Sequence, residues 1–230
     1  MSLLILFAVL PIILLAVLFY HLDELEKEPK QELIKALFCG LISIFLTVLL
    51  SYLVNLQEIE VTSLSALAKI GYSFLAIALI EEMSKWLVTV FFLKKNRQVD
   101  TLFDYILYAI YIALGFALIE NVLYTITGGM LVALVRAFLT VPAHAFYAIA
   151  MGYYLGKAKI YKRKITYLFS LFIPVLLHGT FDSLILVGNL FSYILFFMFV
   201  ISLYLFAILL IRKARRLDMN VSKNKSVKNG

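Results

Sequence analysis

Apolar residues follow one another along this chain in long runs, which short polar loops interrupt. The run at 190–211 (LFSYILFFMFVISLYLFAILLI) contains no charged residue, and about 20 apolar residues in a helix are enough to cross the roughly 30 Å hydrocarbon core of a bilayer. Seven such segments are predicted, at 2–20, 33–55, 64–93, 101–127, 131–156, 165–188 and 190–211. The pattern therefore predicts an all-α protein, a polytopic transmembrane bundle of about seven spans.

Composition and charge agree with this architecture. The chain of 230 residues is 63% hydrophobic and 15% charged, too few charges to cover the surface of a water-soluble domain of this size. All but three of its 21 Lys and Arg residues lie in or beside the first, third and fifth predicted loops or in the C-terminal tail. Because loops rich in Lys and Arg stay cytoplasmic, the N-terminus is predicted outside and the C-terminus inside. This topology explains the net charge of +7 without a nucleic-acid partner.

Ionisable residues inside the spans are the feature that apolar packing does not explain, because such groups usually face the bundle interior, paired or functional. Lys69 is close enough to a predicted helix end to reach water. Asp104 is predicted to pair with the basic residues of the third loop. Arg136 and Glu120 come out at similar depths on neighbouring spans, where an ion pair would account for both.

Four polar segments on successive spans remain. They are 81–85 (EEMSK), 116–121 (FALIEN), 142–144 (PAH) and 178–182 (HGTFD). At about 1.5 Å per residue from the nearest basic loop, Glu82, His144 and His178 lie roughly 18, 20 and 21 Å from the cytoplasmic boundary, and Glu120 lies somewhat nearer the outer surface. Unrelated structural residues have no reason to share a depth, so these segments are predicted to form one site.

Spacing within the segments adds detail. His178 and Asp182 are four residues apart, so they share a helix face, and Glu81 and Lys85 have the same spacing. Glu82 points about 100° away from Glu81 around the helix. Two adjacent carboxylates in a layer of low dielectric constant should not both stay ionised without cations. One is therefore predicted to be a general base and the other to pair with Lys85, with either order open.

In this order on successive spans, EEMSK, GFALIEN, PAHAFYAIAMGYYLG and HGTFD resemble the PrsW family of intramembrane proteases, which is similar to the wider group of CAAX-processing and bacteriocin-processing membrane peptidases. The first loop around 23–29 is similar to the family as well. The chain departs from the wider group in having Glu120 where its FxxxH motif has histidine, Asp182 where asparagine is frequent, and Lys85 in place of an arginine one position later.

The resemblance implies a multi-pass peptidase of the bacterial cytoplasmic membrane that makes the first cut in a single-span membrane protein of the anti-sigma-factor type. Residues 1–217 are the predicted transmembrane peptidase domain, and the polar, basic cytoplasmic tail 218–230 is predicted to be disordered or to lie against anionic lipid. The depth of the polar layer predicts that the cut falls near the extracytoplasmic side. The residues carried over are catalytic Glu81, Glu82 and His178, with supporting Lys85, Glu120, Asn121, His144 and Asp182.

Two mechanisms are compatible with these residues. In the first, His144, His178 and a carboxylate (Asp182 or Glu120) bind Zn²⁺, because two histidines and one carboxylate with an open position form a catalytic zinc set. In the second, a glutamate activates water without a metal. A small proton-coupled transporter or channel would use the same buried groups, although the sequence lacks the internal repeat that transporters often show.

Overall fold

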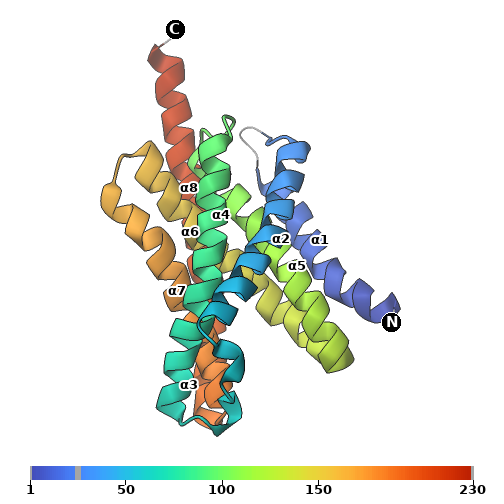
Figure 1. The fold of residues 1–230 in the computed structure, drawn as a ribbon. Helices are drawn as coiled ribbons and strands as arrows, with labels where there is room; N and C mark the ends of the chain where they lie inside the picture. Colours follow the sequence, from blue (N-terminus) through green and yellow to red (C-terminus); the bar gives the residue numbers. More distant parts are fainter. Residues whose placement is uncertain (1, 24–26, 229–230) are drawn as a thin grey trace.

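The computed structural model describes residues 2–23 and 27–228, and these are helical, with no strand among them (Figure 1). The helices are α1 (Ser2–Leu22), α2 (Lys30–Leu53), α3 (Ala66–Tyr72), α4 (Leu79–Lys95), α5 (Leu102–Val135), α6 (Val141–Ile160), α7 (Lys164–Val187) and α8 (Leu190–Lys228). Short 3-10 turns, η1 (Leu56–Glu58) and η2 (Val61–Ser63), follow α2, and π-helical segments η3 (Ser73–Ala78) and η4 (Arg136–Thr140) join α3 to α4 and α5 to α6. The predicted all-α fold is confirmed.

Five stretches of the described chain are long and apolar enough to cross a membrane. They are Leu3–Leu22, Lys30–Leu53, Leu102–Ile160, Lys164–Val187 and Leu190–Val221. The predicted span at 64–93 is not among them, because charged residues, Lys69, Glu81, Glu82 and Lys85, interrupt its apolar character. The chain is thus a multi-pass membrane protein, while the count of seven and the orientation of the termini remain predictions.

The stretch of 59 residues at Leu102–Ile160 is a helical hairpin. At Gly129 the backbone has a φ of 75° and a ψ of −165°, which glycine adopts without steric cost. The two arms then run side by side in opposite directions. A Cβ atom added to Gly152 on α6 would lie 2.3 Å from the carbonyl oxygen of Tyr105 on α5, so glycine is required for the helix backbones to touch.

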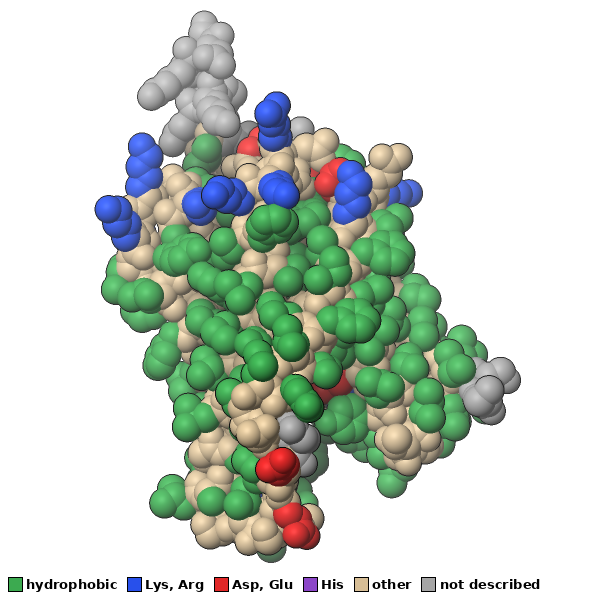
Figure 2. All heavy atoms as spheres, viewed as in Figure 1, with side chains coloured by type: hydrophobic (Ala, Val, Ile, Leu, Met, Phe, Trp, Pro, Cys, Tyr) green, Lys and Arg blue, Asp and Glu red, His purple; other side chains and the backbone are tan. Residues whose placement is uncertain are grey.

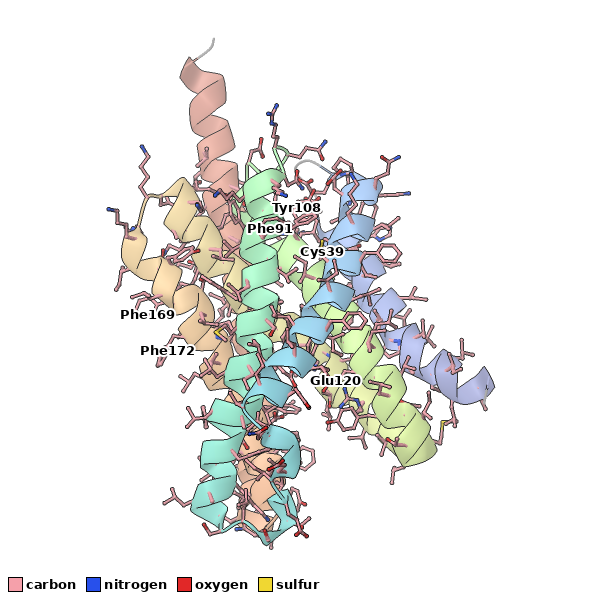
Figure 3. The ribbon with its side chains drawn as sticks, viewed as in Figure 1. Cys39, Phe91, Tyr108, Glu120, Phe169 and Phe172 are labelled. Carbon is pink, nitrogen blue, oxygen red and sulfur yellow. The ribbon has the colours of Figure 1, made fainter. Side chains whose placement is uncertain are left out.

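This hairpin is the centre of the molecule. Within its most apolar window 83% of residues are buried, against 17–33% for the four other stretches. Helix α2 packs on it just as closely, since a Cβ atom on Gly40 would lie 2.1 Å from the carbonyl oxygen of Ile112. The outer helices turn apolar side chains outward, as Figure 3 shows for Phe91 on α4 and Phe169 and Phe172 on α7. The surface suits contact with lipid acyl chains.

Charge is distributed unevenly along the long axis. Figure 2 shows Lys and Arg side chains gathered at one end of the molecule, above a broad apolar belt. We call this the basic end; it contains the start of α2, the end of α4 and the junction of α6 with α7. The loop between α2 and α3, with Glu58 and Glu60, lies at the opposite end. This is the asymmetry that the loop charges predicted.

Two details at the basic end differ from prediction. Asp104 does not pair with the third-loop lysines but forms a capping box with Thr101, accepting a hydrogen bond from the Thr101 backbone at 2.7 Å. The tail predicted to be disordered is helical to Lys228 as part of α8. Its Asp218 is buried and accepts hydrogen bonds from the amides of Leu102 and Phe103. In both cases the amides at the start of α5 need acceptors, and these carboxylates supply them.

Candidate active site

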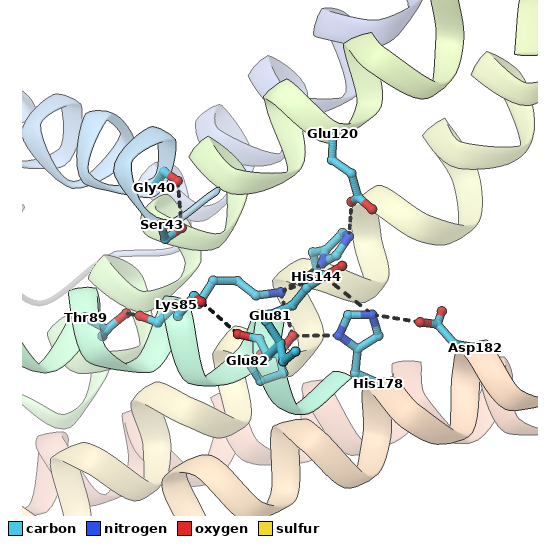
Figure 4. A network of polar contacts seen from close by, with 12 residues as sticks. Gly40, Ser43, Glu81, Glu82, Lys85, Thr89, Glu120, His144, His178 and Asp182 are labelled. Carbon is cyan, nitrogen blue, oxygen red and sulfur yellow. Dashed lines mark hydrogen bonds and ion pairs between the residues drawn. The ribbon is translucent and has the colours of Figure 1, made fainter. Parts of the chain in front are cut away.

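Four neighbouring helices bring the predicted polar residues into one cluster (Figure 4). The contributors are Glu81, Glu82 and Lys85 of α4, Glu120 of α5, His144 of α6, and His178 and Asp182 of α7. The cluster lies well away from the basic end. In Figure 3, Tyr108 lies near the basic end and Glu120 lies in the opposite half of the molecule. The depth argument from the sequence thus located a real convergence, and the catalytic roles remain a prediction.

One side of the cluster is closed. Glu82 and Lys85 are 1% and 2% exposed, and Lys85 Nζ lies 2.6 Å from Glu82 Oε1. His178 Nδ1 contacts the same oxygen at 2.8 Å, and its Nε2 lies 3.2 Å from Asp182 Oδ2. Because carboxylates only accept hydrogen bonds, an imidazole between two of them donates from both nitrogens when it is an imidazolium. Glu82 is therefore held by the Lys85 ammonium group and the His178 ring.

The other side of the cluster is open. The side chains of Glu81, Glu120 and Asp182 are 13%, 16% and 21% exposed. Glu81 Oε2 has no hydrogen bond among the described residues; its nearest cations are Lys85 Nζ at 3.6 Å and His178 Nε2 at 3.9 Å. Glu81 also borders a cavity of about 410 Å³. Of the two adjacent glutamates, Glu81 is the one whose side chain is partly exposed and borders a cavity, although its unpaired Oε2 is itself buried.

Glu120 contacts an arginine and a histidine. Its Oε2 lies 3.0 Å from Arg136 and 2.9 Å from His144 Nε2, which confirms the predicted ion pair with Arg136. Asn121 supports the pair from behind: its Oδ1 accepts from Arg136 Nε at 2.9 Å, and its Nδ2 donates to the Ala8 carbonyl of α1 at 2.7 Å. Asn121 therefore reaches the cluster through Arg136.

Three aromatic residues complete the site, and the sequence interpretation missed them. Tyr147 stacks on His178 with ring centroids 4.9 Å apart. Lys85 Nζ lies 4.3 Å from the Phe116 ring centroid, and Arg136 packs on Tyr124 at 4.4 Å. The signal was present as helical spacing, since Phe116 and Tyr124 flank Glu120 by four residues and Tyr147 follows His144 by three. Aromatic residues are too common in apolar spans for that spacing to stand out.

The donors that converge for a metal ion differ from the predicted set. Ligand atoms of Glu81, Glu120 and His144 all lie within 4.8 Å of one another, whereas the predicted set was His144, His178 and either Asp182 or Glu120. His178 is instead engaged with Glu82 and Asp182. Two carboxylates and an imidazole are donors that suit a divalent cation such as zinc, so the residues present fit such an ion.

Comparisons with known proteins agree with the geometry. Residues 28–209 match the family described as PrsW family intramembrane metalloprotease. Protease PrsW of Geobacillus kaustophilus is 37% identical over 76% of this chain and 76% of its own length. Protease PrsW of Bacillus subtilis is 33% identical over 87% of this chain and 90% of its own. That of Clostridioides difficile is 34% identical over 86% of each. No solved structure matches the chain significantly.

The matched region contains the whole cluster, from Glu81 to Asp182. Relatives that share it over most of their length are named as proteases, which favours a hydrolase over the transporter or channel that buried carboxylates alone would allow. With its apolar helices, the chain is placed in the bacterial cell membrane. It belongs to the PrsW family of intramembrane proteases.

Proposed function

We propose that this protein is an endopeptidase in which Glu81 activates the attacking water, and that it cuts a membrane-anchored regulatory protein of the anti-sigma-factor type. The observation that carries the proposal is the contrast between the two adjacent glutamates. Glu82 is 1% exposed and its Oε1 contacts both Lys85 and His178, while Glu81 is 13% exposed, borders the cavity and has no hydrogen bond at Oε2 among the described residues. A general base must be reachable by the water it deprotonates.

The reaction follows from the positions of the side chains. Glu81 accepts a proton from water as the water oxygen bonds to the carbonyl carbon of the peptide. The negative charge that develops on the carbonyl oxygen is stabilised by the cationic groups nearest Glu81, Lys85 and His178, at 3.6 and 3.9 Å. The carbon–nitrogen bond then breaks, and the proton on Glu81 passes to the departing amine nitrogen. The products are a carboxylic acid and an amine.

A divalent cation is compatible with the same residues. Glu81, Glu120 and His144 would hold it, and when bound it would supply Lewis-acid polarisation of the peptide carbonyl and of water. The rest of the cluster keeps its function in either case. Glu82, Lys85 and His178 fix the α4–α7 contact, and Arg136 orients Glu120.

The side of the membrane on which the cut falls is part of the proposal. The cavity beside Glu81 is lined by the last turns of α2, by η1 and by η3, all in the half of the molecule away from the basic end (Figure 1). In Figure 2 the surface is hollowed between the two lower lobes, with an acidic side chain visible inside. Since basic loops are cytoplasmic, the substrate is cut near its extracytoplasmic side.

Co-expression tests the proposal. Single-span anti-sigma factors of the host bacterium, tagged at both ends, are co-expressed with the wild-type protein or with Glu81→Gln, and the fragments are identified by mass spectrometry. We expect cleavage near the extracytoplasmic membrane surface with the wild type alone. Cleavage in the cytoplasmic segment, or none in any of these substrates, would contradict the proposal. Metal content and chelator sensitivity of the active protein then decide whether a cation takes part.

A further inference from the structure

A cavity of about 410 Å³ lies between α2, η3 and α5, beside the cluster and distinct from its closed side. Its walls are formed by Thr47, Val48, Ser51 and Tyr52 of α2, Leu56 of η1, Tyr72, Ala76 and Ile77 around η3, Tyr124 of α5, and Glu81 of α4. Val48 and Tyr52 are 63% and 68% exposed on the apolar outer surface. The cavity thus connects the lipid-facing side of the bundle with the carboxylate proposed as the base.

Two hydroxyl groups of α2 face this cavity. Thr47 and Ser51 are four residues apart and lie on one helix face. The Thr47 hydroxyl oxygen is buried and has no hydrogen-bond partner among the described residues. A buried polar atom without a partner is costly and uncommon in native structures, so a group that enters the cavity is expected to supply the missing hydrogen bond.

The size and shape of the cavity select the kind of ligand. A helix with side chains is about 10–12 Å across and satisfies its own backbone hydrogen bonds. A cavity of 410 Å³ instead accommodates a few residues of unwound chain, whose backbone amides and carbonyls need partners. Tyr124 also lines the cavity and packs against Arg136, which lies 4.4 Å from its ring centroid.

We propose that this cavity is the subsite for the unwound substrate segment on one side of the scissile bond, with the Thr47 hydroxyl as an anchor for its backbone. The inference rests on the proposed function and adds a place and an anchor for the substrate. The segment enters sideways from the membrane between Tyr52 and η3. The π-helical turn of η3 ends three residues before Glu81, and such turns are frequent at functional sites.

The first test removes the anchor without removing its shape. Thr47→Val keeps the branched side chain and loses the hydroxyl, and Thr47→Ser keeps the hydroxyl. Cleavage of a reporter that the wild-type protein cuts is measured in proteoliposomes. We expect KM to rise about fivefold to tenfold in Thr47→Val, as for a lost hydrogen bond, with kcat within about twofold, and near wild-type KM in Thr47→Ser. An unchanged KM in Thr47→Val, or equal losses in both variants, would overturn the anchor.

The second test fills the cavity. Ser51→Trp is compared with Leu168→Trp, which adds the same ring on the apolar groove between α4 and α7, away from the cluster. We expect at least a hundredfold loss of kcat/KM in Ser51→Trp and wild-type activity in Leu168→Trp, with both variants unfolding at the wild-type temperature. Wild-type activity in Ser51→Trp would overturn the subsite while leaving the proposed peptidase intact.

A binding readout covers the case in which Ser51→Trp misfolds. In the Glu81→Gln background, a cysteine at Val48 is cross-linked to cysteines placed one by one along the reporter, with a cysteine at Leu168 as the control position. We expect cross-links at Val48 to residues next to the cut and none at Leu168. Cross-links of equal yield at both positions would contradict the proposal. If the wild-type protein cuts no reporter, it is the proposed function that fails.

Discussion

Two sets of buried carboxylates, one at the basic end and one in the central cluster, differ in what holds them. At the basic end the partners are neutral groups. The Tyr108 hydroxyl donates to Glu28, the backbone of Thr101 donates to Asp104 at 2.7 Å, and two amides donate to Asp218 at 2.9 and 3.0 Å. These bonds tie the first loop and α8 to the start of α5.

In the central cluster the partners are ionisable side chains. Glu82 contacts Lys85 at 2.6 Å, and Glu120 contacts Arg136 at 3.0 Å. Glu81 lies farther from Lys85, at 3.6 Å, and borders the cavity. Carboxylates whose lone pairs are taken by backbone and hydroxyl donors stabilise the fold. Carboxylates that share cations beside a cavity can exchange protons and bind a substrate. Burial alone does not separate structural from chemical roles; the partners do.

The largest expected difference between the two sets is in activity. Glu81→Gln removes the proposed base at nearly constant shape, and we expect cleavage to fall by about 10²–10⁴-fold with no loss of folded protein. Glu28→Gln makes the same chemical change at the basic end and should leave the rate within about threefold, because lost neutral hydrogen bonds cost little. The rates are measured on one reporter in proteoliposomes. Equal losses in both variants would erase the distinction.

The next largest effect is on stability. Lys85→Met removes the closest cationic partner of the 1% exposed Glu82 and leaves His178 as its remaining partner, and breaking a buried ion pair typically costs about 3–5 kcal/mol. Unfolding in detergent micelles measures the change. The double variant Glu82→Gln with Lys85→Met removes both charges and should recover most of the loss. A double variant as unstable as the single one would show that packing of the lysine, and not charge pairing, matters.

The sequence predicted the helices well where a single run of apolar residues forms one element. It failed where packing decides the local geometry. The predicted span at 64–93 is helical from Ala66 to Lys95, but its middle, Ser73–Ala78, is π-helical, and no local residue pattern predicts that change. The sequence of the tail also did not indicate that α8 continues through Asp218, because the buried contacts of Asp218 depend on the distant start of α5.

The site shows the same division. Depth and spacing brought Glu82, His144 and His178 together correctly, because rise per residue is fixed in a helix. The choice between Glu81 and Glu82 depends on helix rotation, which the neighbouring helices set. Which donors could share a metal ion depends on helix placement in the same way. Glu120 was predicted nearer the outer surface, yet it contacts His144 at 2.9 Å, because helix tilt can absorb such a difference.

A smaller effect sharpens the account of the basic end. Asp218→Ala removes two hydrogen bonds to the amides at the start of α5, and the loss of such a cap costs about 0.5–2 kcal/mol. The exposed neighbour Asn220 provides the control, Asn220→Ala, which should be neutral. Activity at low temperature should be unchanged in both variants. A large loss of activity in Asp218→Ala with unaltered stability would indicate that α8 communicates with the central cluster.

The last effect is a pH dependence that the basic end contributes. Burial raises the pKa of Glu28 from 4.5 to about 7, and the hydrogen bond from Tyr108 offsets only part of this rise. The folded protein therefore holds this proton at pH values where the unfolded chain has released it. The stabilisation is fully present below about pH 4.5 and is lost as the pH rises through about 7. In micelles, the free energy of unfolding should fall with pH between these values. The slope should be smaller than the value of about 1.4 kcal/mol per pH unit that the release of one full proton would give.

Glu28→Gln cannot titrate and should flatten the slope, whereas Glu58→Gln on the opposite loop should keep it. A slope that survives in Glu28→Gln would contradict the assignment of this pH response to Glu28.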